Sequence, residues 1–226
     1  MNGKYLTDND LQLGFSYRQT NSSSAFDDID YAVTGLPVDA DFRTDAKQTY
    51  SMASAAFSLL DGRLKQSLSL SRSDSDNTNL TGQISPDISR GTRDRVMSQT
   101  DLFLGPHTLT FIAEHETEDY AQRGTASSFG DPNKDLTTRN RALAAEYRLN
   151  GDDLELSLSA RHENNSEFQN ALSWRTTAAW HANDTTTLFA SVGDATKNPT
   201  FTERFGFFDA FRGNPALKPE QARSWE

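Results

Sequence analysis

Residues 153–162 read Asp-Leu-Glu-Leu-Ser-Leu-Ser-Ala-Arg-His, so apolar and polar side chains alternate along this segment. Successive side chains of a β-strand point to opposite faces of a sheet. Leu154, Leu156 and Leu158 therefore share one face, whereas Glu155 and Arg161 lie on the other. The segment predicts a strand with one apolar face and one polar face.

The same two-residue period returns along the rest of the chain. From this alternation we predict nine antiparallel strands of about ten residues each and the beginning of a tenth. The predicted strands occupy residues 11–18, 50–60, 64–71, 96–104, 108–118, 143–149, 153–162, 173–180, 185–194 and 221–226.

Short and long connections alternate between these strands. Asp61-Gly62 predicts a tight hairpin because glycine accepts a positive φ, and further short turns are expected at 105–107, 150–152 and 181–184. Polar links separate these turns at 20–48, 73–94, 119–137, 164–170 and 195–220, and only 164–170 is short. Outer-membrane barrels have short periplasmic turns and long external loops, which matches this rhythm.

The composition excludes several classes of protein. The 226 residues are 35% hydrophobic with a net charge of −10, and the mean hydropathy is −0.70. The 14 Phe, 6 Tyr and 3 Trp argue against disorder. The negative charge disfavours nucleic acid as a partner, and the absence of Cys excludes thiolate catalysis and disulfides.

Two fold classes remain on the residues alone. A soluble antiparallel sandwich also alternates, but its strands usually run about five to six residues. A transmembrane barrel with a polar lumen explains longer strands, and charged side chains facing lipid would be costly. We therefore expect the charged face of the strands to point inward. Its members are Arg18, Lys65, Arg148, Glu155, Arg161 and Arg175.

A compound motif near the C-terminus carries a family resemblance. Residues 197–203 read Lys-Asn-Pro-Thr-Phe-Thr-Glu, residues 213–220 read Gly-Asn-Pro-Ala-Leu-Lys-Pro-Glu, and Ser-Trp-Glu follows at 224–226. Both halves resemble the signature of TonB-dependent outer-membrane receptors, and residues 160–168 resemble a further strand end of that family more loosely. The matching motif residues are Pro199, Phe201, Glu203, Gly213, Asn214, Pro215, Leu217, Lys218, Pro219 and Glu220.

The resemblance implies an all-β fold and an import function. Receptors of this family have an antiparallel up-and-down barrel of about 22 strands, with an N-terminal plug. They sit in the bacterial outer membrane in contact with lipid, take energy from TonB and import a scarce small-molecule nutrient. Residue preferences near the motif favour the cobalamin-transporter subgroup over siderophore receptors. We see no plug, TonB box or signal sequence in residues 1–226, so we expect part of a barrel domain.

The link at 195–220 is rich in aromatic residues. One interpretation is that they pack the link on itself or on the barrel rim, and the other is that they contact the nutrient. The prolines lack an N–H donor and fix φ, so they stop strand pairing. The candidate substrate-loop residues are Phe201, Phe205, Phe207, Phe208, Phe211 and Arg212.

The link at 20–48 is rich in aspartate. Ca²⁺ takes six to eight oxygen ligands, often from Asp on loops, and cobalamin receptors use calcium to order such loops. A solvated acidic loop is the alternative interpretation, and no other cofactor is expected. The candidate calcium ligands are Asp27, Asp28, Asp30, Asp39 and Asp41, with Asp45 nearby.

Two rival functions compete with import. A passive porin-type or structural barrel would account for the strands but not for the terminal motif. A barrel enzyme would need a catalytic group at the external rim. His107 and His181 lie in the short turns, whereas His115 and His162 fall on the apolar face. The sequence contains neither G-x-S-x-G nor H-E-x-x-H, so no catalytic residue is proposed.

Overall fold

The computed structural model describes residues 1–6, 11–30, 32–82, 86–126, 130–208 and 211–226. Eleven strands of this part form one antiparallel sheet, in which each strand pairs with its neighbour in sequence up to β10, and β13 then pairs with β10. The strands of the sheet are β1 (Asn2–Leu6), β2 (Gln12–Ile29), β3 (Pro37–Leu59), β4 (Leu64–Leu80), β5 (Asp87–Leu104), β6 (His107–Arg123), β7 (Lys134–Asn150), β8 (Leu154–Asn165), β9 (Ala171–Asn183), β10 (Thr186–Lys197) and β13 (Glu220–Trp225).

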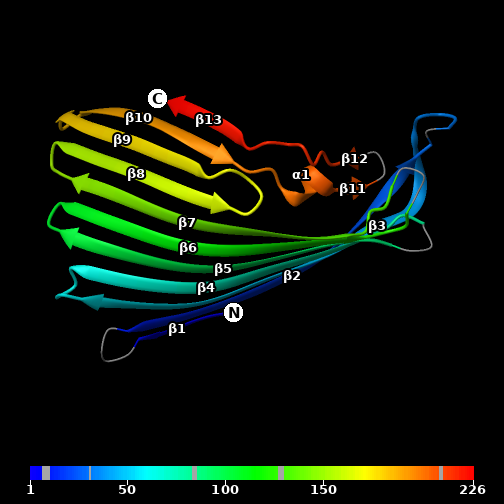
Figure 1. The fold of residues 1–226 in the computed structure, drawn as a ribbon, viewed down its shortest axis with the longest axis horizontal. Helices are drawn as coiled ribbons and strands as arrows, with labels where there is room; N and C mark the ends of the chain where they lie inside the picture. The colour runs from blue at the N-terminus through cyan, green and yellow to red at the C-terminus, as the bar shows by residue number, and fades with distance from the viewer. Residues whose placement is uncertain (7–10, 31, 83–85, 127–129, 209–210) are drawn as a thin grey trace.

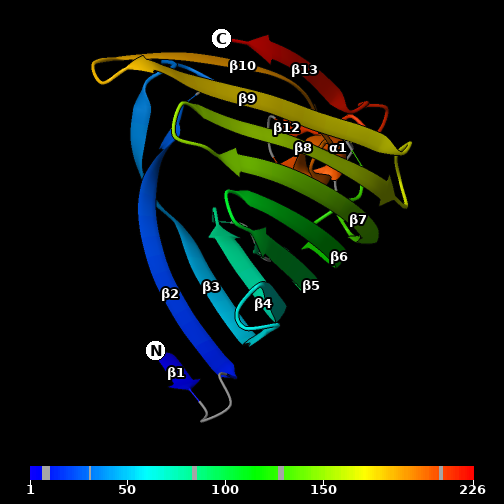
Figure 2. The ribbon, with the colours of Figure 1, turned by 90° about the vertical axis from the view of Figure 1, so that its left-hand side faces the viewer.

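The sheet curves into an open trough. Figure 1 shows the long strands running side by side, and Figure 2 shows the same sheet nearly end-on as an arc whose two edges are β1 and β13. Between β10 and β13 the chain forms helix α1 (Phe201–Phe205) and the small hairpin of β11 (Phe207–Phe208) and β12 (Phe211–Arg212). No helix among the described residues is long and apolar enough to cross a membrane.

All ten predicted strands are present, and the structure adds β1, which is too short to show a period by itself. The prediction that residues 20–48, 73–94 and 119–137 are long polar loops is wrong. Strands β2, β4 and β6 continue through these segments to Ile29, Leu80 and Arg123. Backbone hydrogen bonds between neighbours continue where both faces are polar, so alternation ends before the strand does.

The short turns lie together at one end of the sheet (Figure 1). Gly62 and Gly105 have φ values of 82° and 61°, and the Arg63 amide donates to the Leu60 carbonyl at 3.1 Å. The prediction of tight turns at Asp61-Gly62 and 105–107 is therefore confirmed. At the other end the widest gap between the described strands of the sheet is residues 198–219, between β10 and β13.

Strand register separates the two faces of the sheet as the alternation predicts. Leu143 of β7 lies opposite Ala113 of β6 and His162 of β8, and Leu68 of β4 lies opposite Ala55 of β3. This face forms an apolar belt that is open to the surroundings, with Leu143 66% and Phe111 53% exposed. The other face carries the six inward charges expected from the sequence, for example Arg175 opposite Ser159.

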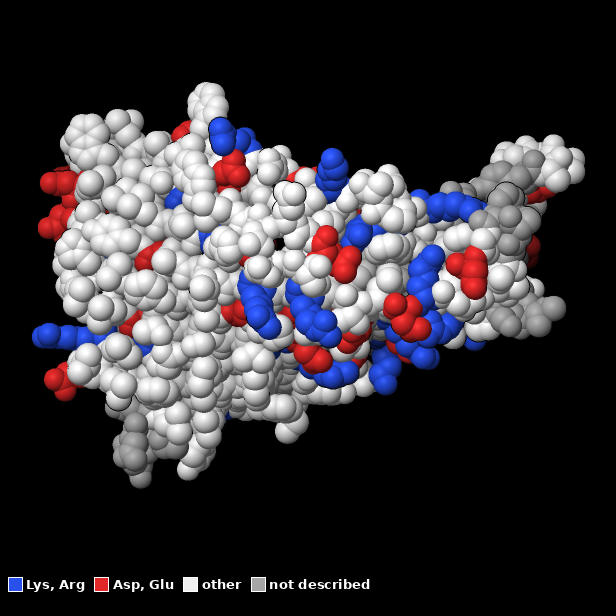
Figure 3. Space-filling model, in the orientation of Figure 1, with Lys and Arg blue, Asp and Glu red and all other residues white. Residues whose placement is uncertain are grey.

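Burial decides between a sandwich and a membrane barrel. Tyr120 and Ala142 are the only buried hydrophobic residues in the described part of the chain. A soluble sandwich must enclose its apolar side chains between two sheets, whereas this single layer exposes them on its convex face. In Figure 3, which shows that face, charged side chains gather toward the end where β2 and β3 extend and are sparse over the middle of the other half. An exposed apolar belt of this kind is typical of the outer face of a transmembrane barrel.

Candidate functional site in the trough

The connection between β10 and β13 folds back onto the concave face of the sheet. Helix α1 begins after Thr200, whose hydroxyl accepts a hydrogen bond from the Glu203 amide at 3.2 Å. In return the Thr200 amide donates to the Glu203 carboxylate at 2.7 Å, which completes a capping box. This short turn of helix is held by its caps, because so few residues form a marginal helix by themselves.

The Glu203 carboxylate also lies near the ammonium group of Lys197, the last residue of β10. Lys197 lies 3.9 Å from Glu203 and 4.0 Å from Glu220, so one ammonium joins the start and the end of the connection. The hydrogen bonds from Thr200, followed by the charge of Lys197, hold the pKa of the exposed Glu203 carboxyl below its ordinary value.

Two contacts attach this connection to β6. The ring of Phe201 stacks on Tyr120, with centroids 5.6 Å apart. The side chain of Gln122 is fully buried, and its Nε2 donates to the Phe207 carbonyl at 2.6 Å while the Phe207 amide donates to its Oε1 at 3.2 Å. The side-chain amide thus acts as a strand partner for the backbone of β11.

The glycine of the signature permits a close backbone crossing. A Cβ on Gly213 would lie 2.5 Å from the Arg204 carbonyl carbon and 2.7 Å from its oxygen. The Gly213 amide donates to the Gly206 carbonyl at 2.8 Å, and the Asn214 amide donates to the Glu203 carbonyl at 2.9 Å. Residues from both halves of the motif therefore meet around α1. This contact gives a structural reason why the two halves occur together in the sequence.

Arg204 is the charged centre of the folded connection. Its guanidinium lies 4.8 Å from the ring centroid of Phe168 and 4.6 Å from that of Phe205, distances at which a cation is attracted to the ring face. It also forms an ion pair with Glu167 at 3.5 Å. Glu167 and Phe168 follow β8, so Arg204 ties the connection to the loop between β8 and β9.

Charged side chains form a network along the inner wall of β5, β6 and β8. Arg161 donates to Glu114 at 3.0 Å and to Glu163 at 2.7 Å, and Arg95 also pairs with Glu114. The Glu114 side chain is only 5% exposed. A buried carboxylate requires such pairing because an uncompensated charge is costly away from water.

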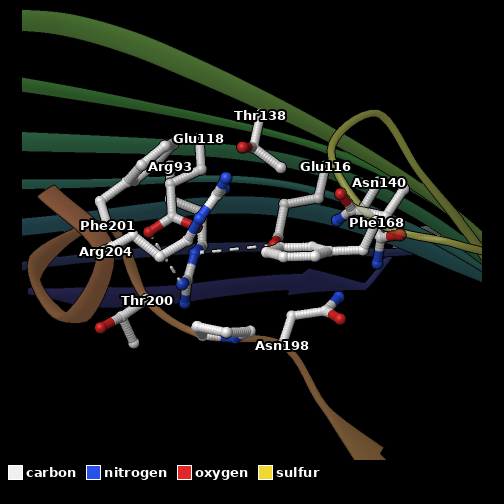
Figure 4. A pocket seen from close by; sticks show the side chains of 12 residues that line it. Arg93, Glu116, Glu118, Thr138, Asn140, Phe168, Asn198, Thr200, Phe201 and Arg204 are labelled. Atoms are coloured by element: carbon white, nitrogen blue, oxygen red, sulfur yellow. Dashed lines mark hydrogen bonds and ion pairs between the residues drawn. The ribbon is translucent and has the colours of Figure 1, made fainter. Parts of the chain in front are cut away.

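A hollow of about 200 Å³ opens between the connection and this wall. Figure 4 shows that its labelled side chains point toward one another from β5, β6 and β7 and from the segment around α1. Arg93 pairs with Glu116 at 3.7 Å and with Glu118 at 3.3 Å. Two buried atoms of the hollow, Asn140 Oδ1 and Arg204 Nε, have no hydrogen-bond partner among the described residues. One is an acceptor and the other a donor, so a polar ligand or water would satisfy both.

The predicted substrate-loop residues are divided by the structure. Phe201 lines the hollow, whereas Phe205 contacts Arg204, and Phe207 packs under the Arg212 guanidinium at 4.7 Å. Phe211 is 44% exposed, and the side chain of Phe208 lies outside the described residues. Packing of the connection on the inner wall thus accounts for several of these aromatics, and their contact with a nutrient stays a prediction.

Sequence reasoning missed the partners on the wall. The alternation Glu114, Glu116, Glu118 in β6 could have indicated an inward acidic row. Nothing local to Gln122 predicts its bond to Phe207, and nothing local to Arg93 predicts that it lines a hollow with Arg204. Only the curvature of the sheet brings these residues together.

The acidic candidates do not gather in this structure. Asp27 and Asp28 end β2, Asp39 and Asp41 begin β3, and Asp30 accepts hydrogen bonds from the Val33 amide at 3.1 Å and the Thr34 hydroxyl at 3.1 Å. Among the described residues, no three carboxylate or imidazole groups lie close enough to hold a metal ion. Calcium binding by these residues stays a prediction.

An antiparallel up-and-down sheet with an apolar outer belt, a charged inner wall and a connection folded into the trough has the architecture of a transmembrane β-barrel segment. The family described as TonB dependent receptor-like, beta-barrel, matches residues 2–226, and the chain belongs to this family.

Solved receptors share the fold at low sequence identity. The siderophore receptor PirA of Acinetobacter baumannii superposes with a TM-score of 0.77 at 16% identity, covering 98% of this chain and 39% of its own. The Serratia marcescens hemophore receptor HasR, solved as a double mutant with its hemophore HasA and heme, gives 0.76 at 15% identity and covers 99% and 40%. The ferric preacinetobactin receptor BauA of A. baumannii gives 0.57 at 12% identity and covers 97% and 42%. The chain spans about two fifths of the length of these receptors.

Proposed function

We propose that this chain is the part of a bacterial outer-membrane receptor that helps to bind a scarce iron complex, a siderophore or heme, for TonB-coupled import. The observation that carries the proposal is the hollow beneath the connection between β10 and β13. It combines the guanidinium groups of Arg93 and Arg204 with the aromatic wall of Phe168 and Phe201.

The chemistry of the hollow suits such a cargo. Siderophores and heme present carboxylate, carbonyl or hydroxyl oxygens around an apolar or aromatic body. An arginine side chain donates to such oxygens in a planar fork, and the unpartnered Nε of Arg204 is available to one of them. The similar structures named above are a siderophore receptor, a hemophore receptor with heme and a ferric preacinetobactin receptor, and they support an iron complex over cobalamin.

Uptake assays would test this proposal. In a strain lacking the complete receptor, we expect the receptor gene to restore uptake of a ⁵⁵Fe-loaded siderophore or growth on hemin. The double variant Arg93→Gln/Arg204→Gln should weaken binding about tenfold or more, because hydrogen bonds to charged groups are the stronger ones. Arg148→Gln is the matched control, since Arg148 faces inward but pairs with Glu146 at 2.9 Å, away from the hollow.

Radiolabelled cobalamin provides the second arm. Restored cobalamin uptake with no response to any iron complex would contradict the iron proposal and would favour membership of the cobalamin-transporter subgroup. No uptake of either class would contradict both. Equal losses in the double variant and in Arg148→Gln would mean that the hollow has no specific part in binding.

A further inference from the structure

The convex face carries a charged band just beyond the apolar belt, and most arginines in it are neutralised by aspartate. Arg72 lies 3.1 Å from Asp74, and Arg90 lies 2.9 Å from Asp76. Three similar pairs follow the same face of other strands. They are Arg43 with Asp45, Arg123 with Asp135, and Arg223 with Asp194.

Two neighbouring arginines of β7 depart from this pattern. Arg139 and Arg141 are exposed on the convex face, and neither forms an ion pair with any residue in the described part of the chain. The convex-face carboxylates closest in register have other partners. Asp94 pairs with Arg72 at 3.2 Å, and Asp119 accepts a hydrogen bond from Thr137 at 2.5 Å. Within the described part of the chain, the two arginines therefore carry their positive charge without a salt bridge.

Strand register places these charges at the edge of the belt. Arg141 lies opposite His115 of β6 on one side and Asn164 of β8 on the other. Together with Leu143 and His162 they line an open hollow of about 410 Å³ on the convex face. The hollow thus has hydrogen-bond donors on the side away from the short turns and an apolar floor toward the belt.

We propose that this hollow binds the phosphate group of an anionic lipid in the external leaflet. The short turns mark the periplasmic end of a barrel, so Arg139 and Arg141 lie at the level where headgroups of the external leaflet meet the acyl chains. Arginine holds phosphate through two parallel hydrogen bonds, and the lipid chains of the same molecule would lie along Leu143 and Ala113. The donors and the apolar floor together fit a lipid rather than a free anion.

Lipid retention by the complete receptor would test this site. The receptor is purified in detergent, incubated with diphosphoryl lipid A or with the same lipid after removal of its phosphates, and bound lipid is counted by native mass spectrometry. We expect the phosphorylated lipid to be retained and Arg139→Gln/Arg141→Gln to bind it at least about tenfold more weakly. Arg72→Gln/Arg90→Gln is the matched control, because it removes the same charge from arginines that aspartates already neutralise.

Each further outcome decides against the proposal. Undiminished retention in the β7 variant, or an equal loss in the control variant, would show that these arginines do not form the site. Equal retention of the dephosphorylated lipid would remove the phosphate from the proposal. Displacement of the lipid by inorganic phosphate at similar concentration would indicate a free-anion site. The heat-dependent gel mobility of each variant shows that its barrel is folded, so a loss of binding cannot come from unfolding.

Discussion

Gln122 and Phe207 exchange two hydrogen bonds in the way that neighbouring strands do. Phe207 uses its backbone, whereas Gln122 uses its side-chain amide. The side-chain amide of Gln122 donates to the Phe207 carbonyl at 2.6 Å and accepts from the Phe207 amide at 3.2 Å. Because Gln122 is fully buried on the inner wall, the pair attaches the folded connection to the barrel.

Replacing Gln122 by Leu keeps the volume and removes both hydrogen bonds. Each backbone group left unpaired costs about 1–3 kcal/mol, so we expect the connection to open more often and trypsin to cleave after Arg212 about tenfold faster or more. Gln99→Leu is the control, since Gln99 also faces inward but bonds to Asp101 at 3.0 Å. Equal cleavage of the two variants would show that the Gln122 pair does not hold the connection.

Gly213→Ala should open the same connection by a different cause. The new Cβ would lie 2.5 Å from the Arg204 carbonyl carbon, closer than packed atoms approach. Overpacking of this kind costs about 1–3 kcal/mol, and hydrogen exchange at the Gly206 amide, which bonds to Thr202 at 2.9 Å, should accelerate. Gly3→Ala is the matched control because nothing lies within 4 Å of its added Cβ. Unchanged exchange in Gly213→Ala would contradict the crossing geometry.

The stability that the Glu203 cap gives to α1 should depend on pH. The pKa of Glu203 is lowered in the folded protein, so its contribution to stability is present above the ordinary value of 4.5 and is lost as the pH falls through the lowered pKa. We expect protection of the Arg204 amide to fall only below pH 4.5 when exchange is measured as a function of pH. Glu203→Gln should remove this dependence, and a transition above pH 4.5 would contradict the assignment.

A new charge should lower the stability of the receptor on the convex face of the sheet but not on the inner face. Phe111→Arg places a cation in the apolar belt, where it costs about 2–4 kcal/mol at the bilayer midplane. Ser67→Arg places the same charge on the inner face, opposite Gln99. Urea titration of the complete receptor in lipid, followed by gel mobility, should show a lower midpoint for Phe111→Arg alone. A soluble sheet would tolerate Phe111→Arg at this exposed position, and an unchanged midpoint would refute the membrane placement.

The sequence by itself determined the strands and their faces, because side-chain direction in a strand depends only on position along the chain. The alternation at residues 153–162 and the turn at Asp61-Gly62 are local signals of this kind, and both are confirmed. The terminal motif likewise indicated the family, and its two halves lie together around α1.

Tertiary structure alone decided the length of the strands and the identity of the site. Strands β2, β4 and β6 extend beyond the apolar belt because backbone pairing with neighbours continues where side-chain alternation has stopped. Arg93 and Arg204 line one hollow, and Gln122 bonds to Phe207, because the sheet curves and the connection folds into its trough. No period or spacing encodes such contacts, since each depends on how segments far apart in the chain are brought together in space.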